Sequence, residues 1–228
     1  MSAELSAPQA TPTAAMLKTL GIVSTVCGLI IVGAYLGTYD AVQVNKRLAL
    51  EREVFKVLPA AKTMAEFIAL PEGGIRPAGG DAPAGTVKFY AGYDGQGQLA
   101  GIAAEGGAKG YADTVRILFG YQPDCQCVTG FGVVSMRETP GIGDKILTDA
   151  DFRASFKALD ARLNAEMKVL ANEIKAVKHG TKTQDWQIDA IAGATITSRA
   201  VGKAVNDAAQ ALLPRLLPHI DRLKEPTS

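Results

Sequence analysis

A run of 21 residues without a charged side chain, Thr19 to Tyr39, constrains the fold of this chain more than any other feature. As an α-helix the run would be roughly 31 Å long at 1.5 Å per residue, enough to cross the hydrocarbon core of a bilayer. Tyr35 and Tyr39 lie near its end, where aromatic rings favour the membrane–water interface. The run is long for a cleaved signal peptide, and no clean small-x-small cleavage site follows it. We therefore expect a retained transmembrane helix over residues 19–39.

The segments on either side of this run differ in composition. Residues 1–18 are rich in Ser, Ala, Pro and Thr, which predicts a disordered tail, placed on the cytoplasmic side. Residues 40–70 are predicted as a connecting helix, with a partial apolar stripe as far as Ala61. The basic residues of that segment favour a cytoplasmic position for the following chain, but acidic residues are interleaved with them. The charge pattern therefore leaves the side of the membrane open.

Residues 71–228 predict a single domain of the α+β class, because strand patterns come first and helical patterns later. The segment 71–85 is too rich in Gly and Pro for a regular element. The expected strands are residues 86–93 and 98–104, joined by an Asp-Gly-Gln-Gly hairpin, then 114–120, 127–136 and 187–191. The expected helices are residues 151–178, where apolar residues recur every three or four positions, and 198–213, which stops near Pro214.

Charge and cysteine content exclude several classes of function. The chain has 24 basic and 23 acidic residues, which argues against nucleic-acid binding. Its three cysteines are Cys27, Cys125 and Cys127, and they show no spacing typical of a disulfide framework or a metal site. A disulfide between Cys125 and Cys127 would be strained at so short a separation. Ligation of an iron–sulfur cluster shared with a partner protein stays open. We assign no metal ligand and no catalytic residue.

The most informative stretch runs from Asp189 to Ser198 (DAIAGATITS). Small residues before Thr195 leave its backbone uncovered, so another molecule can approach closely. A helix is predicted to begin within about three residues, with Thr197 or Ser198 as its N-cap. The free N–H groups of a helix N-terminus can bind a phosphate group. A capped helix start with small packing residues explains the same pattern, so spacing alone does not decide.

This stretch resembles the flavinylation motif of the FMN-binding domain family, an Asp and small residues followed by Ser/Thr-Gly-Ala-Thr. Ala192 stands where the family usually has Ser or Thr, and Ala190 where Gly is common. The resemblance implies that Thr195 carries FMN through a phosphoester made by a separate flavin transferase. The other residues it implies at the cofactor are Gly193, Ala194, Ile196 and Thr197.

A second stretch, Glu138 to Asp144 (ETPGIGD), resembles the Glu-Thr-Pro-Gly-Leu-Gly loop of the same family. It follows a predicted strand and contains too much Gly and Pro to continue it. The resemblance implies that Glu138 and Thr139 bond polar edges of the flavin, and that Gly141 lets the backbone approach it. Taken alone, the stretch would be an ordinary turn.

The layout of the whole chain is similar to that of the G subunits of Rnf ion-translocating electron-transport complexes. That resemblance implies an electron carrier whose covalent FMN relays single electrons between partner proteins, in a complex coupling ferredoxin and NAD chemistry to Na+ or H+ movement. It implies as partners the other membrane and peripheral subunits, the flavin transferase and membrane lipid. It also implies a bacterial inner-membrane location with the domain on the periplasmic, outer side. The chain would be a redox component of a translocase, not a complete enzyme, because it has no nucleotide-binding GxGxxG and no charge in its span.

Three alternatives remain at this point. The C subunit of the sodium-pumping NADH:quinone oxidoreductase shares the motif but is typically longer. A membrane-anchored FMN-binding regulatory domain would use the same flavin without a relay role. A domain without flavin would use the Gly-rich loops only for packing.

Overall fold

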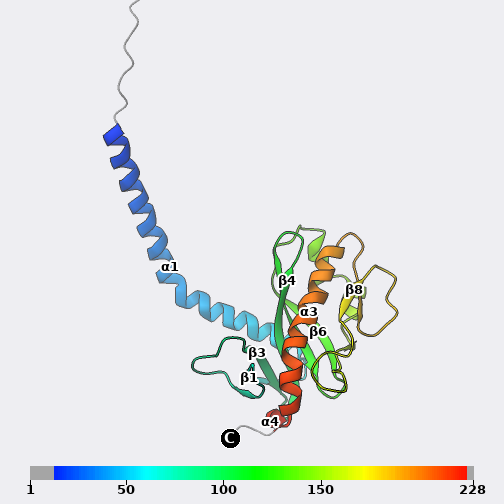
Figure 1. Ribbon diagram of the computed structural model, residues 1–228. Helices are drawn as coiled ribbons and strands as arrows, with labels where there is room; N and C mark the ends of the chain where they lie inside the picture. The colour runs from blue at the N-terminus through cyan, green and yellow to red at the C-terminus, as the bar shows by residue number, and fades with distance from the viewer. Residues whose placement is uncertain (1–12, 225–228) are drawn as a thin grey trace, which may run out of the picture. The chain divides into compact units, whose positions relative to one another are not determined.

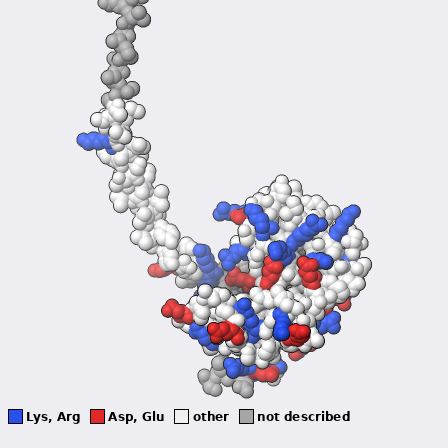
Figure 2. Space-filling model, viewed as in Figure 1, with Lys and Arg blue, Asp and Glu red and all other residues white. Residues whose placement is uncertain are grey.

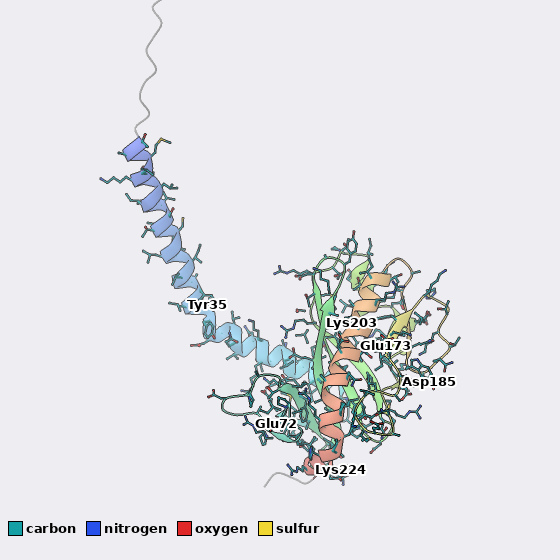
Figure 3. The ribbon with its side chains drawn as sticks, in the orientation of Figure 1. Tyr35, Glu72, Glu173, Asp185, Lys203 and Lys224 are labelled. Atoms are coloured by element: carbon teal, nitrogen blue, oxygen red, sulfur yellow. A yellow bond between two sulfur atoms is a disulfide. The ribbon has the colours of Figure 1, made fainter. Side chains whose placement is uncertain are left out.

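The computed structural model describes residues 13–224, which divide between residues 49 and 50 into two compact units. The first unit consists of most of helix α1 (Thr13–Val57), whose apolar side chains there are exposed. Among the described residues, α1 alone is apolar enough to cross a membrane: an 18-residue window has a mean hydropathy of 2.1 and none of it is buried. Side chains around Tyr35 are exposed (Figure 3), and no charge interrupts the apolar segment (Figure 2).

Helix α1 includes the whole predicted span, 19–39, and extends beyond it at both ends. Residues 1–12 of the predicted tail lie outside the described part of the chain, whereas residues 13–18 are helical rather than disordered. Ala, Met and Leu residues there are good helix formers, which explains the extension. The predicted connecting helix over 40–70 is correct only as far as Val57. Pro59 cannot continue the helix, and a strand follows instead.

The second unit is built on a seven-stranded sheet in which every neighbouring pair is antiparallel. The strand order is β2-β1-β3-β4-β5-β6-β7. The bounds are β1 Thr63–Ala69, β2 Ile75–Pro77, β3 Val87–Tyr93, β4 Leu99–Lys109, β5 Thr114–Gln122, β6 Cys127–Ser135 and β7 Leu159–Asp160. The two predicted hairpins, β3–β4 and β5–β6, are confirmed, as is the α+β class. A separate parallel pair joins β8 (Lys175–Val177) to β9 (Gln187–Asp189).

One face of the sheet is covered by α3 (Thr195–Leu216), which packs against β4, β5 and β8 (Figure 1). The short helices are η1 (Gly143–Leu147), α2 (Ala150–Ala154), η2 (Leu217–His219) and α4 (Asp221–Lys224). Gly106 of β4 lets α3 lie close to the sheet, since a Cβ there would collide with the carbonyl oxygen of Ala204. The larger hydrophobic cluster of the domain lies on this face and includes Phe89, Phe119, Val201 and Leu212.

The opposite face is covered by the last turns of α1, from Leu50 onward. A smaller cluster forms there, in which Val54, Val57 and Leu58 pack on Tyr90 and Leu118. Glycines on four strands face this helix end and the residues just after it: Gly92, Gly101, Gly120 and Gly132. A Cβ on Gly120 would lie only 2.5 Å from the carbonyl oxygen of Val57. The missing side chains therefore make room for the helix end, for its backbone at Gly120 and for its side chains at the other positions.

The long helix predicted over residues 151–178 is wrong: only α2 is helical there. Most of its apolar residues are buried as the pattern required, although Met167 is 40% exposed. They lie on an irregular chain in which some backbone donors bind side chains instead of helical carbonyls. The N–H groups of Leu170 and Ile174 donate to Gln210 and Asn206 of α3, at 2.9 and 3.0 Å. Because tertiary partners satisfy these donors, the chain can leave the helical path while keeping most of its apolar side chains buried.

The two neighbouring cysteines form a disulfide, contrary to the expectation from their spacing. Cys125 and Cys127 lie at the turn between β5 and β6, with Cα atoms 5.2 Å apart. Gln126 between them adopts a left-handed conformation with φ 50°, which brings the two side chains to the same side. The sulfur atoms are therefore bonded to each other and not available as cluster ligands.

Candidate functional site

A cavity of about 430 Å³ lies where three segments of the second unit meet. They are the turn between β4 and β5, the loop leading into η1, and the start of α3. The residues that line it are Tyr111, Glu138, Thr139, Ile142, Gly143, Gly193, Ala194, Thr195, Ile196 and Thr197. Both sequence motifs therefore meet in one cavity, although some 50 residues separate them in the chain.

Thr195 is the first residue of α3 and is partly exposed to the cavity. Gly193 precedes it with φ 83°, a conformation that favours glycine. The residue that caps the helix, Ala194, provides no side-chain hydrogen bond. The first N–H groups of any α-helix have no intrahelical acceptor, and here Ala194 does not supply one from its side chain. Within the described residues, the Thr195 hydroxyl makes no hydrogen bond, so it is free to react or to bind.

The predicted N-cap residues are instead buried inside the first turn of α3. The Ser198 hydroxyl accepts a hydrogen bond from the Ile191 N–H at 3.1 Å and donates one to the Ala194 carbonyl at 2.9 Å. Thr197 is 2% exposed, and its hydroxyl donates to Glu138 Oε2 at 2.8 Å. Thr195 is therefore the hydroxyl of this turn that remains available to another molecule.

Glu138 makes contacts with protein groups on both of its carboxylate oxygens. Besides the bond from Thr197, its Oε1 accepts from the Ala112 N–H at 3.2 Å. Gly110 and Gly143 lie against it, and a Cβ at either position would collide with the Glu138 side chain. The carboxylate was expected to bond the flavin, and the structure shows that it already joins the walls of the cavity.

Three apolar residues line the cavity while remaining unusually exposed. Tyr111, Ile142 and Ile196 are 68%, 49% and 51% exposed, each from a different wall. Together they form an apolar rim that a planar hydrophobic ring would cover. Only Ile196 was predicted. The place of Ile142 inside the second motif was a usable signal for it, whereas nothing in the sequence around Tyr111 indicates its position.

Gly141 and Asp189 belong to the motifs but do not line the cavity. With φ 75°, Gly141 forms the turn that places its neighbours Ile142 and Gly143 there. The Asp189 carboxylate accepts from the Gly180 N–H at 2.7 Å and lies 3.3 Å from His179 Nδ1. It therefore fixes the loop before the motif rather than contacting the cavity.

The cavity suits the FMN that the motif implies. Its volume lies within the range of about 300–1,000 Å³ common for ligand pockets. The rim of Tyr111, Ile142 and Ile196 matches an aromatic ring system, and the free N–H groups beside Thr195 match a phosphate. The residues present are thus chemically complementary to both ends of a flavin mononucleotide.

Comparison with known proteins identifies the same region. The family model described as "FMN-binding domain" matches residues 110–210, which include all of the lining residues. The G subunit of the proton-translocating ferredoxin:NAD(+) oxidoreductase complex of Clostridium ljungdahlii is 30% identical, over 86% of this chain and 89% of that protein. The G subunit of the Na(+)-translocating ferredoxin:NAD(+) oxidoreductase complex of Acetobacterium woodii is also 30% identical, over 75% of each chain.

Solved structures show a similar fold at lower identity. The NqrC protein of Shewanella oneidensis has a TM-score of 0.54 and 21% identity, covering 79% of this chain and 99% of that one. The C subunit of the Na(+)-translocating NADH-quinone reductase of Parabacteroides distasonis has a TM-score of 0.58 and 15% identity, covering 82% and 98%. At these identities the likeness is one of fold.

Proposed function

Because the chain belongs to the family of G subunits of ion-translocating oxidoreductase complexes, we propose that it carries FMN as a phosphoester on Thr195. The chain is an electron-transfer protein with an FMN-binding domain, and it acts as a redox component of a larger complex. When bound, FMN supplies the one-electron chemistry, and the protein supplies attachment, orientation and a partly dry surface. The finer assignment concerns the atom to which the flavin is joined.

The observation that carries this assignment is the state of the three hydroxyls in the first turn of α3. Thr197 and Ser198 are buried and hydrogen-bonded, whereas Thr195 lines the cavity without a hydrogen-bond partner among the described residues. The positive end of the helix dipole and the first N–H groups favour a negative phosphoester at this position. The apolar rim would shield one part of the ring from water.

The proposal extends to partners and location. The flavin would be attached by a separate transferase, and α1 would hold the chain in the cytoplasmic membrane of a bacterium, in contact with lipid. The domain would face the periplasmic or outer side, beside other subunits that exchange electrons with ferredoxin and NAD while Na+ or H+ is moved. The Cys125–Cys127 disulfide supports that side, because disulfides persist in oxidising compartments.

Intact mass of the full chain, co-expressed with a flavin transferase, tests the attachment. The wild type should gain the mass of FMN less water, and Thr195→Ala should lose the gain entirely. Thr148→Ala is the matched control, because Thr148 is exposed and outside the cavity. A Thr195→Ala protein that keeps the added mass would refute the assignment and direct attention to another hydroxyl.

The fold likeness to NqrC proteins favours a second candidate, a component of an NADH:quinone oxidoreductase. The 30% identity to a G subunit over most of the chain favours the first. Purification of the native complex separates them. Electron transfer between ferredoxin and NAD supports the first assignment, and NADH-dependent quinone reduction supports the alternative.

A further inference from the structure

We propose that Glu138 is a positioning residue that holds the cavity in the form that accepts the flavin, and that its charge lowers the flavin's reduction potential. This inference rests on the proposed function for its consequence, but its structural part concerns the protein alone. It assigns the carboxylate to the walls of the cavity rather than to a flavin polar edge.

Glu138 links three segments that are distant in sequence. Its Oε1 accepts from the N–H of Ala112, 26 residues earlier, in the turn between β4 and β5. Its Oε2 accepts from the hydroxyl of Thr197, 59 residues later, in α3. Its own backbone belongs to the loop that forms the third wall. One side chain therefore connects all three walls of the cavity.

The surroundings are built to admit this side chain. Gly110 and Gly143 leave the space that the Glu138 carboxylate and its stem occupy, because a Cβ at either position would collide with them. Ala112 and Thr197 both donate hydrogen bonds, and an ionised carboxylate is an acceptor on both oxygens. Removing it would leave a buried hydroxyl and a backbone N–H to find new partners, which is costly in a folded domain.

The connection to Thr197 also determines where Thr195 lies. The two threonines are two residues apart in the same helical turn, so a bond that fixes Thr197 fixes the first turn as a unit. The same bond engages the Thr197 hydroxyl, which is buried. Glu138 thereby presents Thr195 to the cavity and withholds the competing hydroxyl.

The charge has a separate consequence. Glu138 lines the cavity, so its negative carboxylate is close to any electron acceptor bound there. A nearby negative charge opposes the addition of an electron, and it does so more strongly away from bulk water. Replacing the carboxylate by an amide should therefore make the bound flavin easier to reduce, while the hydrogen bonds can be kept.

Four variants of the full chain test these two roles. Glu138→Ala and Thr197→Val remove the bond from opposite ends, so a folding failure of one leaves the other informative. Glu138→Gln and Thr197→Ser are the conservative partners, since an amide can accept from Ala112 and donate to Thr197. Glu105→Gln is the control, a carboxylate paired with Arg116 and outside the cavity.

The first measurement uses protein made without the transferase, so it does not depend on flavin. Hydrogen exchange of the bonded amides of Ala112 and Ser198 should be at least tenfold faster in Glu138→Ala than in the wild type. In Thr197→Val, exchange of the Ser198 amide should be at least tenfold faster. The exchange rates of the conservative variants and of the control should stay within about twofold of the wild-type rates. Unchanged exchange in Glu138→Ala and Thr197→Val would overturn the positioning role.

The second measurement uses co-expressed transferase and flavin occupancy by intact mass. The occupancy of Glu138→Ala and of Thr197→Val should be at least tenfold lower than that of the wild type. The occupancy of Glu138→Gln should stay within about twofold of the wild type, and its flavin should have a more positive midpoint potential. A Glu138→Gln protein that loses occupancy as Glu138→Ala does would overturn the hydrogen-bonding role, and an unchanged potential would overturn the electrostatic one. A wild type without added mass on Thr195 would refute the proposed function, while the exchange experiment would still test the positioning role.

Discussion

The two faces of the seven-stranded sheet are covered by different parts of the chain, and they serve different purposes. On one face α3 packs over a large cluster of aliphatic and aromatic residues, and its first turn forms a wall of the cavity. On the other, the last turns of α1 cover a small cluster opposite four glycine positions. Packing on the α3 face therefore shapes the cofactor site. Packing on the α1 face holds the last turns of α1, from Leu50 onward, against the sheet.

The largest expected effect comes from filling the closest contact on the α3 face. Gly106→Ala places a Cβ against the Ala204 carbonyl, so α3 must move away from β4. Overpacking of this kind costs roughly 3 kcal/mol of the free energy of unfolding. Because α3 carries Thr195, flavin occupancy should fall as well. Chemical denaturation of the unloaded chain in detergent, with intact mass after co-expression, measures both. Full occupancy would show that the site tolerates movement of α3.

The matching change on the other face should separate stability from cofactor content. Gly120→Ala places a Cβ 2.5 Å from the Val57 carbonyl and should cost about 2 kcal/mol, since a helix end can shift more easily than a full helix. The cavity is formed by the start of α3 on the opposite side of the sheet, so occupancy per folded chain should equal that of the wild type. The same two measurements apply. A loss of flavin equal to that of Gly106→Ala would mean that the two faces are not independent.

The smallest effect is expected at the edge of the sheet, which is covered neither by α3 nor by the end of α1. The Arg162 side chain hydrogen-bonds Asp160 of β7 at 2.8 Å and holds the pKa of that carboxyl below its usual range. The stabilisation is present above the ordinary aspartate pKa of about 3.9 and is lost as the pH falls through the lower folded-state value. Arg162→Gln should lower the free energy of unfolding only slightly at neutral pH, because the arginine is largely exposed and solvent screens the pair.

A series of denaturation curves against pH checks the sign. The difference between Arg162→Gln and the wild type should shrink as the pH is lowered below about 4, the ordinary aspartate value. Flavin occupancy should not change at any pH at which the chain is folded. A difference that grew on acidification would show that the arginine stabilises the domain in another way.

The strands of the two hairpins, β3 to β6, were predictable from the sequence because their signals are local. β1 and β2 were not, since the first was expected as helix and the second as loop. Alternating apolar residues and the Asp94 turn define β3 and β4 without reference to the rest of the chain. The segment 151–178 was not predictable in the same way. Its three- and four-residue apolar spacing is typical of a helix, but side chains of α3 supply hydrogen bonds to its backbone, and no local pattern shows that.

The residues of the candidate site also divide into those with a local sequence signal and those without one. Most of its residues lie in two recognisable motifs, so they were predictable, including the proposed attachment position Thr195. Tyr111 reaches the cavity only because β4 and β5 pair, and the role of Glu138 depends on contacts across 26 and 59 residues. Contacts between residues so far apart in the chain produce no repeating pattern in the sequence, so they could not be predicted from it. The Cys125–Cys127 bond was missed because an uncommon backbone conformation at Gln126 makes it feasible.

The bond between Glu138 and Thr197 joins a loop to a helix that is synthesised much later, so no short peptide from this chain contains the assembled turn. Under the proposed function, a transferase that needs that turn would bypass nascent or misfolded chains. The flavin absorbance of a preparation, divided by its protein concentration, would then give the fraction of molecules that have completed their tertiary structure. Attachment of the prosthetic group would then be restricted to chains whose domain has folded.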